Sequence, residues 1–180
     1  LVIDGGNTHF WSEIAVNMAG FHGKKLGGIL HPGTFSLLGV GVSFAVSAKN
    51  VDPNRNVVLI SGDGAFLSGG LSIEAAFQEN RPIVVVIDNN GGLDCISQQQ
   101  ERLFASGTHY ATDFRDIPFH AMFEGLGGHG ELVTRREDII PAVQRAMASG
   151  KTACVNVKVK GVISPIVLAT TSKRDKASIE

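Results

Sequence analysis

The sequence predicts an α/β protein in three layers, with helices on both faces of a parallel sheet. Short β-branched runs alternate with helix-length amphipathic segments along the chain, which is typical of βαβ units. The two central runs, residues 57–61 and 83–88, are apolar on both faces. A strand needs this property when helices cover it on both sides, so these runs favour a parallel sheet over an antiparallel one.

The expected elements follow the chain in order. We expect strands at residues 1–4, 57–61, 83–88 and 153–159, and a weaker one at 130–133. Amphipathic patterns predict helices at residues 8–18, 36–48, 70–79, 117–126 and 136–148. Residues 170–180 are polar and charged, and they receive no element. We therefore expect one domain over residues 1–163, followed by a C-terminal tail over residues 164–180.

Composition narrows the classes of function. A chain of 180 residues with 43% hydrophobic and 18% charged residues suits one soluble domain with its own core. Its formal charge of −1, without a large basic cluster, argues against nucleic acid as a partner. Two cysteines without a CxxC pair indicate neither a disulfide framework nor a zinc site. No leader or membrane-length apolar run is visible, so we expect a cytoplasmic protein without a membrane partner. The absent initiator Met suggests a piece of a longer polypeptide.

Polar residues follow the two central strands at the point where each strand ends. Gly62-Asp63-Gly64 ends one strand and Asn89-Asn90 ends the next, with room for one crossover helix between them. Because neighbouring parallel strands end at the same edge, the Asp63 carboxylate and the Asn90 amide oxygen can converge. Magnesium prefers such oxygen ligands and commonly takes others from phosphates and water.

Glycines near these residues favour an anion at the same place. Gly64 lets the backbone approach a phosphate closely, and the amides at Gly69 and Gly70 precede a predicted helix. Either polar motif alone would be an ordinary turn signal. Together, at the ends of two buried strands one crossover apart, they predict a clamp that holds a diphosphate through magnesium.

The segment GDGAFLSGGLSIEAAFQENRPIVVVIDNN resembles the thiamine-diphosphate motif, in which Gly-Asp-Gly is followed some two dozen residues later by Asn-Asn. Nearly the whole chain, from the loop Asp4-Gly5-Gly6-Asn7-Thr8 to residue 159, is similar to the C-terminal diphosphate-binding domain of the acetolactate synthase superfamily. That superfamily includes benzaldehyde lyase and 2-hydroxyacyl-CoA lyase. The resemblance implies thiamine diphosphate and magnesium as cofactors, both bound by residues 1–163.

The resemblance also implies roles for individual residues. The magnesium ligands would be the side chains of Asp63 and Asn90 and the backbone carbonyl of Gly92. Asn7 and Thr8 match the loop that anchors the diphosphate, although they also suit a helix N-cap. The cofactor contacts implied in this way are Asn7, Thr8, Ser36, Leu37, Leu38, Gly62, Gly64, Ala65, Asn90, Gly92 and Leu93.

Residues 31–39 match the loop that faces the aminopyrimidine of the cofactor in this superfamily. There Leu38 would be the bulky apolar residue that wedges the cofactor into a bent shape, and the carbonyl of Ser36 would accept from the amino group. Without the resemblance, Leu37 and Leu38 are equally well explained as core residues at the start of a helix. Of six scattered histidines, only His31, beside this loop, stands out as a candidate functional residue.

The activity implied is that of a carboligase, lyase or decarboxylase acting on 2-oxo acids or 2-hydroxyacyl compounds. In the family, the glutamate that starts catalysis lies on a separate pyrimidine-binding domain, which nothing in these residues matches. We therefore assign no catalytic residue to this chain and expect it to be inactive alone. Its expected partner is a pyrimidine-binding domain of the same or another chain, in a homo-oligomer.

Several alternatives stay open. Cys95 and Gln99 stand where acetolactate synthases have Met and Trp, so the donor and acceptor substrates are not defined. The chain could instead be a separate subunit of a split 2-oxo acid decarboxylase, or a non-catalytic cofactor-binding relative. A nucleotide-binding Rossmann domain is disfavoured because no G-x-G-x-x-G motif opens the first helix.

Overall fold

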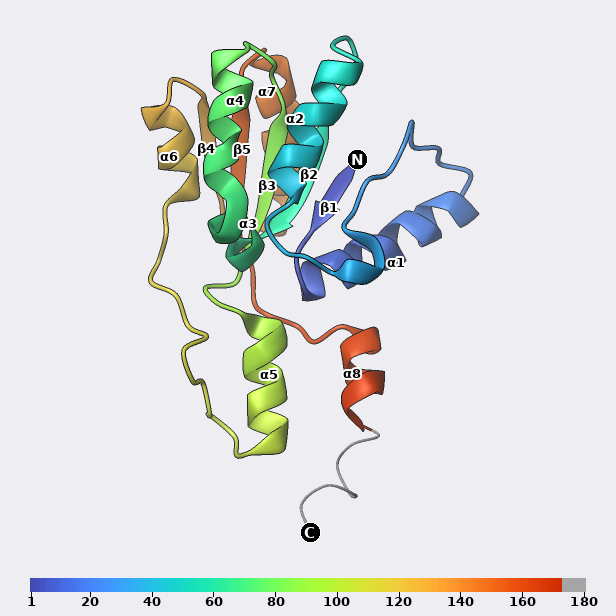
Figure 1. Ribbon diagram of the computed structural model, residues 1–180, viewed down its shortest axis with the longest axis vertical. Helices are drawn as coiled ribbons and strands as arrows, with labels where there is room; N and C mark the ends of the chain where they lie inside the picture. Colours follow the sequence, from blue (N-terminus) through green and yellow to red (C-terminus); the bar gives the residue numbers. More distant parts are fainter. Residues whose placement is uncertain (173–180) are drawn as a thin grey trace.

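A five-stranded parallel sheet in the order β1-β2-β3-β5-β4 forms the centre of the computed structural model, which describes the backbone of residues 1–172 and the side chains of residues 1–169 (Figure 1). All five predicted strands are confirmed to within one residue at each end. They are β1 (Val2–Asp4), β2 (Val58–Gly62), β3 (Val84–Asn89), β4 (His129–Val133) and β5 (Ala153–Lys158). Leu30 adds a single parallel bridge to Val2 at the outer edge.

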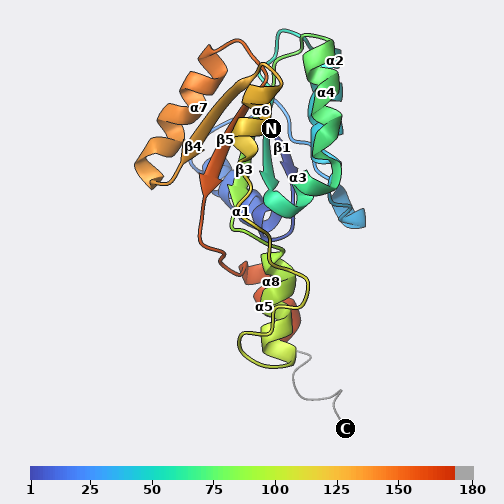
Figure 2. The ribbon, with the colours of Figure 1, turned by 90° about the vertical axis from the view of Figure 1, so that its left-hand side faces the viewer.

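Helices cover both faces of this sheet, which confirms the predicted three layers (Figures 1 and 2). One face is covered by α2 (Gly41–Val51), α3 (Asp63–Gly69), α4 (Glu74–Gln78) and α6 (Phe119–Gly125). The other face is covered by α1 (Asn7–Phe21) and α7 (Ile139–Ala148). Because each central strand is buried on both sides, its sequence needs apolar residues at nearly every position.

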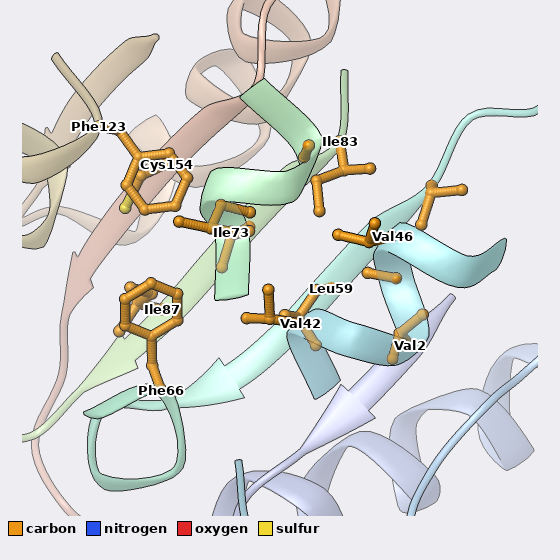
Figure 3. Close-up of a cluster of buried hydrophobic side chains, with 14 of the residues drawn as sticks. Val2, Val42, Val46, Leu59, Phe66, Ile73, Ile83, Ile87, Phe123 and Cys154 are labelled. Carbon is orange, nitrogen blue, oxygen red and sulfur yellow. The ribbon is translucent and has the colours of Figure 1, made fainter. Parts of the chain in front are cut away.

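The larger of two core clusters lies between the sheet and the four-helix face (Figure 3). Phe66 packs edge-on against Phe119, with 5.6 Å between ring centroids, and also contacts Phe123. On the opposite face, Ala142 and Ala146 of α7 are fully buried against the strands. Aromatic pairs of this geometry stabilise a core beyond their buried area. The core therefore holds β2 and β3 rigidly, and these two strands carry the predicted site at their ends.

All of the predicted helices are present, but several begin at other residues than expected. The helix expected at residues 36–48 begins only at Gly41, because Ser36 and Gly39 have positive φ angles of 48° and 90° that no α-helix accepts. The region 70–79 is a short 3-10 turn, η2 (Gly70–Ile73), followed by α4. The region 136–148 is likewise η3 (Arg136–Asp138) followed by α7.

Three helices were not predicted. The Gly-Asp-Gly segment, interpreted as a turn, contains the start of α3. Beyond the carboxyl ends of the strands lie α5 (Asp94–Leu103) and α8 (Pro165–Ser172), at the bottom of Figure 1. Helix α8 occupies the first half of the expected tail, and Ser164 before it is fully buried. Residues 173–180 of that tail lie outside the described residues, and the boundary after residue 163 stays a prediction. Within residues 1–172, every helix is too short or too polar to cross a membrane.

Candidate functional site

A cavity of about 300 Å³ lies at the carboxyl ends of β1, β2 and β3. It is lined by all of the predicted site residues except Leu37, that is by Asn7, Thr8, Ser36, Leu38, Gly62, Asp63, Gly64, Ala65, Asn90, Gly92 and Leu93. Two larger hollows, of about 680 and 820 Å³, contain neither Asp63 nor Asn90. The polar groups predicted from distant parts of the sequence thus come together in the smaller cavity.

Asp63 is the most constrained polar residue of the cavity. Its side chain is only 2% exposed and accepts three backbone hydrogen bonds, from Gly64 (2.7 Å), Gly91 (2.8 Å) and Gly92 (3.1 Å). Burial raises the pKa of this carboxyl, the hydrogen bonds oppose that shift, and the nearby Asp88 adds to it. No cationic side chain among the described residues pairs with Asp63. A buried carboxylate without a counter-charge is costly, and a bound cation would offset that cost.

The two asparagines after β3 have different surroundings. Asn89 points into the fold, where its amide donates to Asn156 Oδ1 at 2.9 Å. Asn90 turns toward the cavity, and its Oδ1 accepts from the Gly92 N–H at 3.1 Å. That same N–H also lies 3.1 Å from Asp63 Oδ2. Two oxygen atoms from neighbouring strand ends therefore converge on one point, and Asn90 is the asparagine that faces it.

Glycines make this convergence possible. A Cβ atom on Gly92 would lie 2.6 Å from the carbonyl oxygen of Thr112, which is backbone and cannot move aside easily. A Cβ atom on Gly64 would lie 2.4 Å from Leu93 Cδ2. Gly92 thus needs to be glycine for close packing beside Asp63, whereas at Gly64 the Leu93 side chain would have to move. The loop after β3 is held from the far side as well, because the Leu93 N–H donates to the Thr112 carbonyl at 2.8 Å.

Asn7 and Thr8 are the first residues of α1, but neither side chain caps the helix. The Thr8 hydroxyl donates to Asp88 Oδ2 at 2.6 Å. The Asn7 amide donates to Gln98 on α5, and its Oδ1 accepts from the Ser164 N–H at 3.1 Å. The alternative N-cap interpretation is therefore wrong for these side chains. Instead they join α1 to β3, α5 and the segment before α8.

Residues 36–38 form an exposed loop rather than the start of a helix. Leu37 is 61% exposed and Leu38 is 39% exposed, so the core interpretation of both is wrong. Leu38 borders the cavity with Ser36, whereas Leu37 is not part of its lining. Two Asp4 contacts fix the far end of the loop, because Asp4 Oδ2 accepts from the N–H groups of Gly39 (3.0 Å) and Gly41 (2.7 Å).

Further residues line the cavity that the sequence did not single out for it: Gly5, Gly6, His9, Phe10, Asp94, Cys95 and Ile96. Cys95 and Ile96 belong to the unpredicted helix α5, so missing that helix also hid its contribution to the wall. Asp88 was treated only as a strand residue. Its pKa is raised by burial, a shift that the Thr8 hydrogen bond opposes. The fully buried Asp63 and the half-buried Asp88 therefore both lie near the cavity.

Comparison with known proteins agrees with this geometry. Residues 4–157 match the family described as the thiamine pyrophosphate enzyme, C-terminal TPP binding domain. The chain is 39% identical over 129 residues to an acetolactate synthase large subunit of Mycobacterium tuberculosis, covering 71% of this chain and 23% of the relative. It is 31% identical over 133 residues to 2-hydroxyacyl-CoA lyase 2 of Danio rerio, covering 71% of this chain and 21% of the relative.

A 2-hydroxyacyl-CoA lyase of Arabidopsis thaliana is 28% identical over 149 residues, which cover 80% of this chain and 25% of that relative. The matched parts therefore span about a quarter of the length of these curated relatives. Thiamine pyrophosphate is another name for thiamine diphosphate, the cofactor that the Gly-Asp-Gly and Asn-Asn motifs imply. The family match covers nearly all of the sheet and the whole cavity wall, and we conclude that this chain belongs to the C-terminal TPP-binding domain family of thiamine pyrophosphate enzymes.

Proposed function

We propose that this chain is the diphosphate- and magnesium-binding domain of a thiamine-diphosphate-dependent carboligase, lyase or decarboxylase. Its substrates would be 2-oxo acids or 2-hydroxyacyl compounds. The observation that carries the proposal is the convergence of Asp63 Oδ2 and Asn90 Oδ1 on the N–H of Gly92, at 3.1 Å each. Carboxylate, amide and backbone carbonyl oxygens suit magnesium, and diphosphate oxygens and water can complete its octahedron.

Magnesium would be held by the side chains of Asp63 and Asn90 and by the carbonyl of Gly92. The chain fits this role because Asp63 is buried without a cationic partner among the described residues. The Asp63 oxygens already accept three N–H bonds, so the carboxylate is fixed in one orientation before an ion arrives. Such preorganisation lowers the entropic cost of binding.

The diphosphate would lie between the first turn of α1 and the start of α3, where Thr8, Gly64 and Ala65 line the cavity. The start of α3 borders the cavity, and the positive end of a helix would favour an anion there in addition to the bridging ion. Thr8 can donate to a phosphate oxygen only by releasing Asp88, since a hydroxyl has one proton to donate. Thr8 therefore couples the cavity to the half-buried Asp88 carboxyl.

The ring end of the cofactor would contact the loop at residues 36–38. The Ser36 carbonyl would accept from the aminopyrimidine, and Leu38 would press against the bent cofactor, with Leu37 and Leu93 as flanking apolar contacts. The exposed, unpacked position of Leu38 at the cavity mouth supports this role over a purely structural one. When bound, the cofactor supplies the electron sink for the carbon–carbon bond chemistry, while the chain orients it.

The wall provided by α5 bears on the choice of substrate. The Gln99 amide donates to the Cys95 carbonyl at 2.9 Å, and its nitrogen lies 3.6 Å from the Cys95 sulfur. This polar pair replaces the Met and Trp of acetolactate synthases, so a 2-hydroxyacyl lyase activity is a specific second candidate. Relatives of both names are among the similar proteins. A screen of 2-oxo acids against 2-hydroxyacyl-CoA esters separates the two.

We propose further that activity requires a pyrimidine-binding domain that supplies the catalytic glutamate, from the same or another chain. The complete enzyme would be a cytoplasmic homo-oligomer, at least a dimer, in which this domain alone is inactive. A separate subunit of a split 2-oxo acid decarboxylase would have the same requirement. Mixing the purified domain with a candidate partner, and measuring turnover of a 2-oxo acid, tests it directly.

The decisive experiment is calorimetric titration of thiamine diphosphate into the longest natural form of the protein, with magnesium and then with EDTA. We expect binding with magnesium and none with EDTA. Asp63→Ala should lose the magnesium-dependent binding with its circular dichroism unchanged, and Asp116→Ala, on the surface, should bind like the parent. Binding unaffected by EDTA or by Asp63→Ala would overturn the clamp. Binding without turnover in the complete protein would favour the non-catalytic relative.

A further inference from the structure

A second group of metal-binding side chains lies at the edge of the cavity and has no role in the proposed clamp. His9 and Glu13 are one turn apart on α1, and His31 lies on the loop that follows the Leu30 bridge. One ligand atom from each of these three residues lies within 4.8 Å of the other two. They come from two segments that are distant in sequence, so helical periodicity alone does not explain the cluster.

The distances within the cluster suit a transition-metal ion. Glu13 Oε1 lies 3.0 Å from His9 Nε2 and 3.9 Å from His31 Nδ1. Tetrahedral ligands at about 2.0–2.1 Å from zinc lie roughly 3.4 Å apart, which falls between these two values. His31 Nδ1 accepts from the Gly33 N–H at 3.2 Å, so metal binding at this nitrogen would replace that hydrogen bond.

The surroundings restrict where the three side chains can move. The His9 ring is buried, stacks on Phe10 with 5.6 Å between centroids, and lies 5.1 Å from the His31 ring. His31 and Glu13 are both about one third exposed, which leaves a path from solvent for an ion. A site with one fixed ligand and two accessible ones can capture a metal without unfolding.

Another histidine of this chain provides an internal contrast. His109 also contacts two carboxylates, but its Nδ1 bonds to Asp113 (2.9 Å) and its Nε2 to Glu101 (2.8 Å). The two carboxylates lie on opposite edges of the ring and cannot share an ion with it. Proximity of histidine to acidic residues is therefore common in this molecule, whereas convergence of three ligand atoms is found only at His9, Glu13 and His31 among the described residues.

We propose that His9, Glu13 and His31 bind a divalent transition-metal ion, with zinc as the expected occupant. Two imidazoles and one carboxylate are ligands that zinc accepts, whereas magnesium prefers oxygen alone. The site is distinct from the magnesium clamp at Asp63. Three protein ligands leave a fourth position for water or another small ligand.

An ion at this site would join α1 to the loop that carries Ser36 and Leu38. His31 stands at the start of that loop, and the Asp4 contacts with Gly39 and Gly41 hold its end. His9 is itself part of the cavity wall. Leu30, just before His31, is already held by its bridge to Val2, so the metal would add a second restraint at the start of this segment, next to the proposed cofactor.

Cobalt(II) tests the site because its visible absorption reports coordination by nitrogen and oxygen ligands. The protein is used without a histidine tag, in its longest natural form, stripped with EDTA and titrated with cobalt in excess magnesium. Magnesium keeps cobalt away from the clamp. Variants Glu13→Gln and His31→Ala are compared with His109→Ala as the matched histidine control and Asp63→Ala as the clamp control.

We expect one cobalt ion per chain, displaced by an equivalent of zinc, in the parent and in both control variants. Glu13→Gln and His31→Ala should each weaken cobalt binding by more than about a hundredfold, since even residues behind the ligands commonly contribute 10- to 100-fold. Glu13→Gln changes one partly exposed atom, so its circular dichroism should match the parent. Absence of a cobalt signal in the parent, an undiminished signal in either ligand variant, or its loss in Asp63→Ala would each overturn the proposal.

Discussion

Two loops at the carboxyl edge of the sheet differ in how they are supported. The loop after β3 contacts Asp63, and its Gly92 lies against the Thr112 carbonyl, which leaves no room for a side chain there. The loop at residues 33–38 exposes Phe35 and Leu37 to solvent, with 92% and 61% of their surfaces accessible. The chain thus builds the charged part of its proposed site by itself. The apolar part is left uncovered, as expected where a second domain or a ligand completes it.

Gly92→Ala should have the largest effect on cofactor binding, because it changes the loop after β3 that contacts Asp63. The added Cβ would lie 2.6 Å from the Thr112 carbonyl oxygen, so the loop must shift away from Asp63. We expect loss of magnesium-dependent thiamine diphosphate binding in calorimetry, and a free energy of unfolding lower by about 1–3 kcal/mol.

Gly125→Ala is the matched control for this change. A Cβ there meets no atom within 4 Å, and the residue is helical, so its stability should stay within about 1 kcal/mol of the parent. Normal cofactor binding by Gly92→Ala would show that the loop tolerates displacement, and the contrast between the two loops would disappear.

Leu38→Ala probes the uncovered loop and should separate stability from activity. The side chain has little to lose in packing, so the free energy of unfolding should change by less than about 1 kcal/mol. Leu59→Ala, in the fully buried core, should cost about 2–5 kcal/mol by comparison. In the complete enzyme we expect Leu38→Ala to lower turnover about tenfold or more, while magnesium-dependent binding persists. Turnover equal to that of the parent would remove Leu38 from the site.

The smallest effect is expected on the pH dependence of stability, from a substitution at Asp4, which hydrogen-bonds the end of the loop at residues 33–38. Burial raises the pKa of the Asp4 carboxyl above its ordinary value of 3.8, against the opposing hydrogen bonds from Gly41 and Gly39. The folded protein therefore binds this proton more tightly than the unfolded chain. The resulting contribution to stability is full below pH 3.8 and is lost as the pH rises through the raised pKa.

Asp4→Asn cannot titrate, so its stability relative to the parent should increase as the pH rises from 3.8 toward neutrality. Urea unfolding of both proteins over a pH series measures this difference. Glu124→Gln, at an exposed site on α6, is the control and should show a smaller trend. A difference between Asp4→Asn and the parent that stays constant with pH would contradict the prediction.

The strands and the Asp63 region were predictable because their signals are local and strong. Continuous apolar β-branched runs such as residues 57–61 have few alternatives to a buried strand, and the polar residues that end them must meet at one edge. Asn90 was predicted to face Asp63, and the family resemblance then gave it the role of a magnesium ligand. Its geometry supports that choice, since Asn89 is committed to Asn156.

The remaining features depend on tertiary contacts that no local pattern reveals. Helix α5 is mostly polar, with only Cys95, Ile96 and Leu103 as apolar residues, so it lacks the repeated apolar positions that mark a buried helix. Ser36 adopts a left-handed conformation that glycine usually takes, which shifts the start of α2 without a warning in the sequence. The exposure of Leu38 was unpredictable for the same reason, because a leucine beside glycines suits a core equally well.

Asn7 also constrains the order in which the chain can assemble. Its side chain hydrogen-bonds both Gln98 and Ser164. Ser164 lies 157 residues after Asn7 in the sequence, so this part of the cavity wall depends on a contact between distant parts of the chain. During synthesis, β1 and α1 leave the ribosome long before residue 164 does. The Asn7 side chain, in the first turn of α1, can therefore adopt its final position only after Ser164 has been synthesised. Folding of the sheet should precede completion of the cavity, both on the ribosome and in refolding from denaturant.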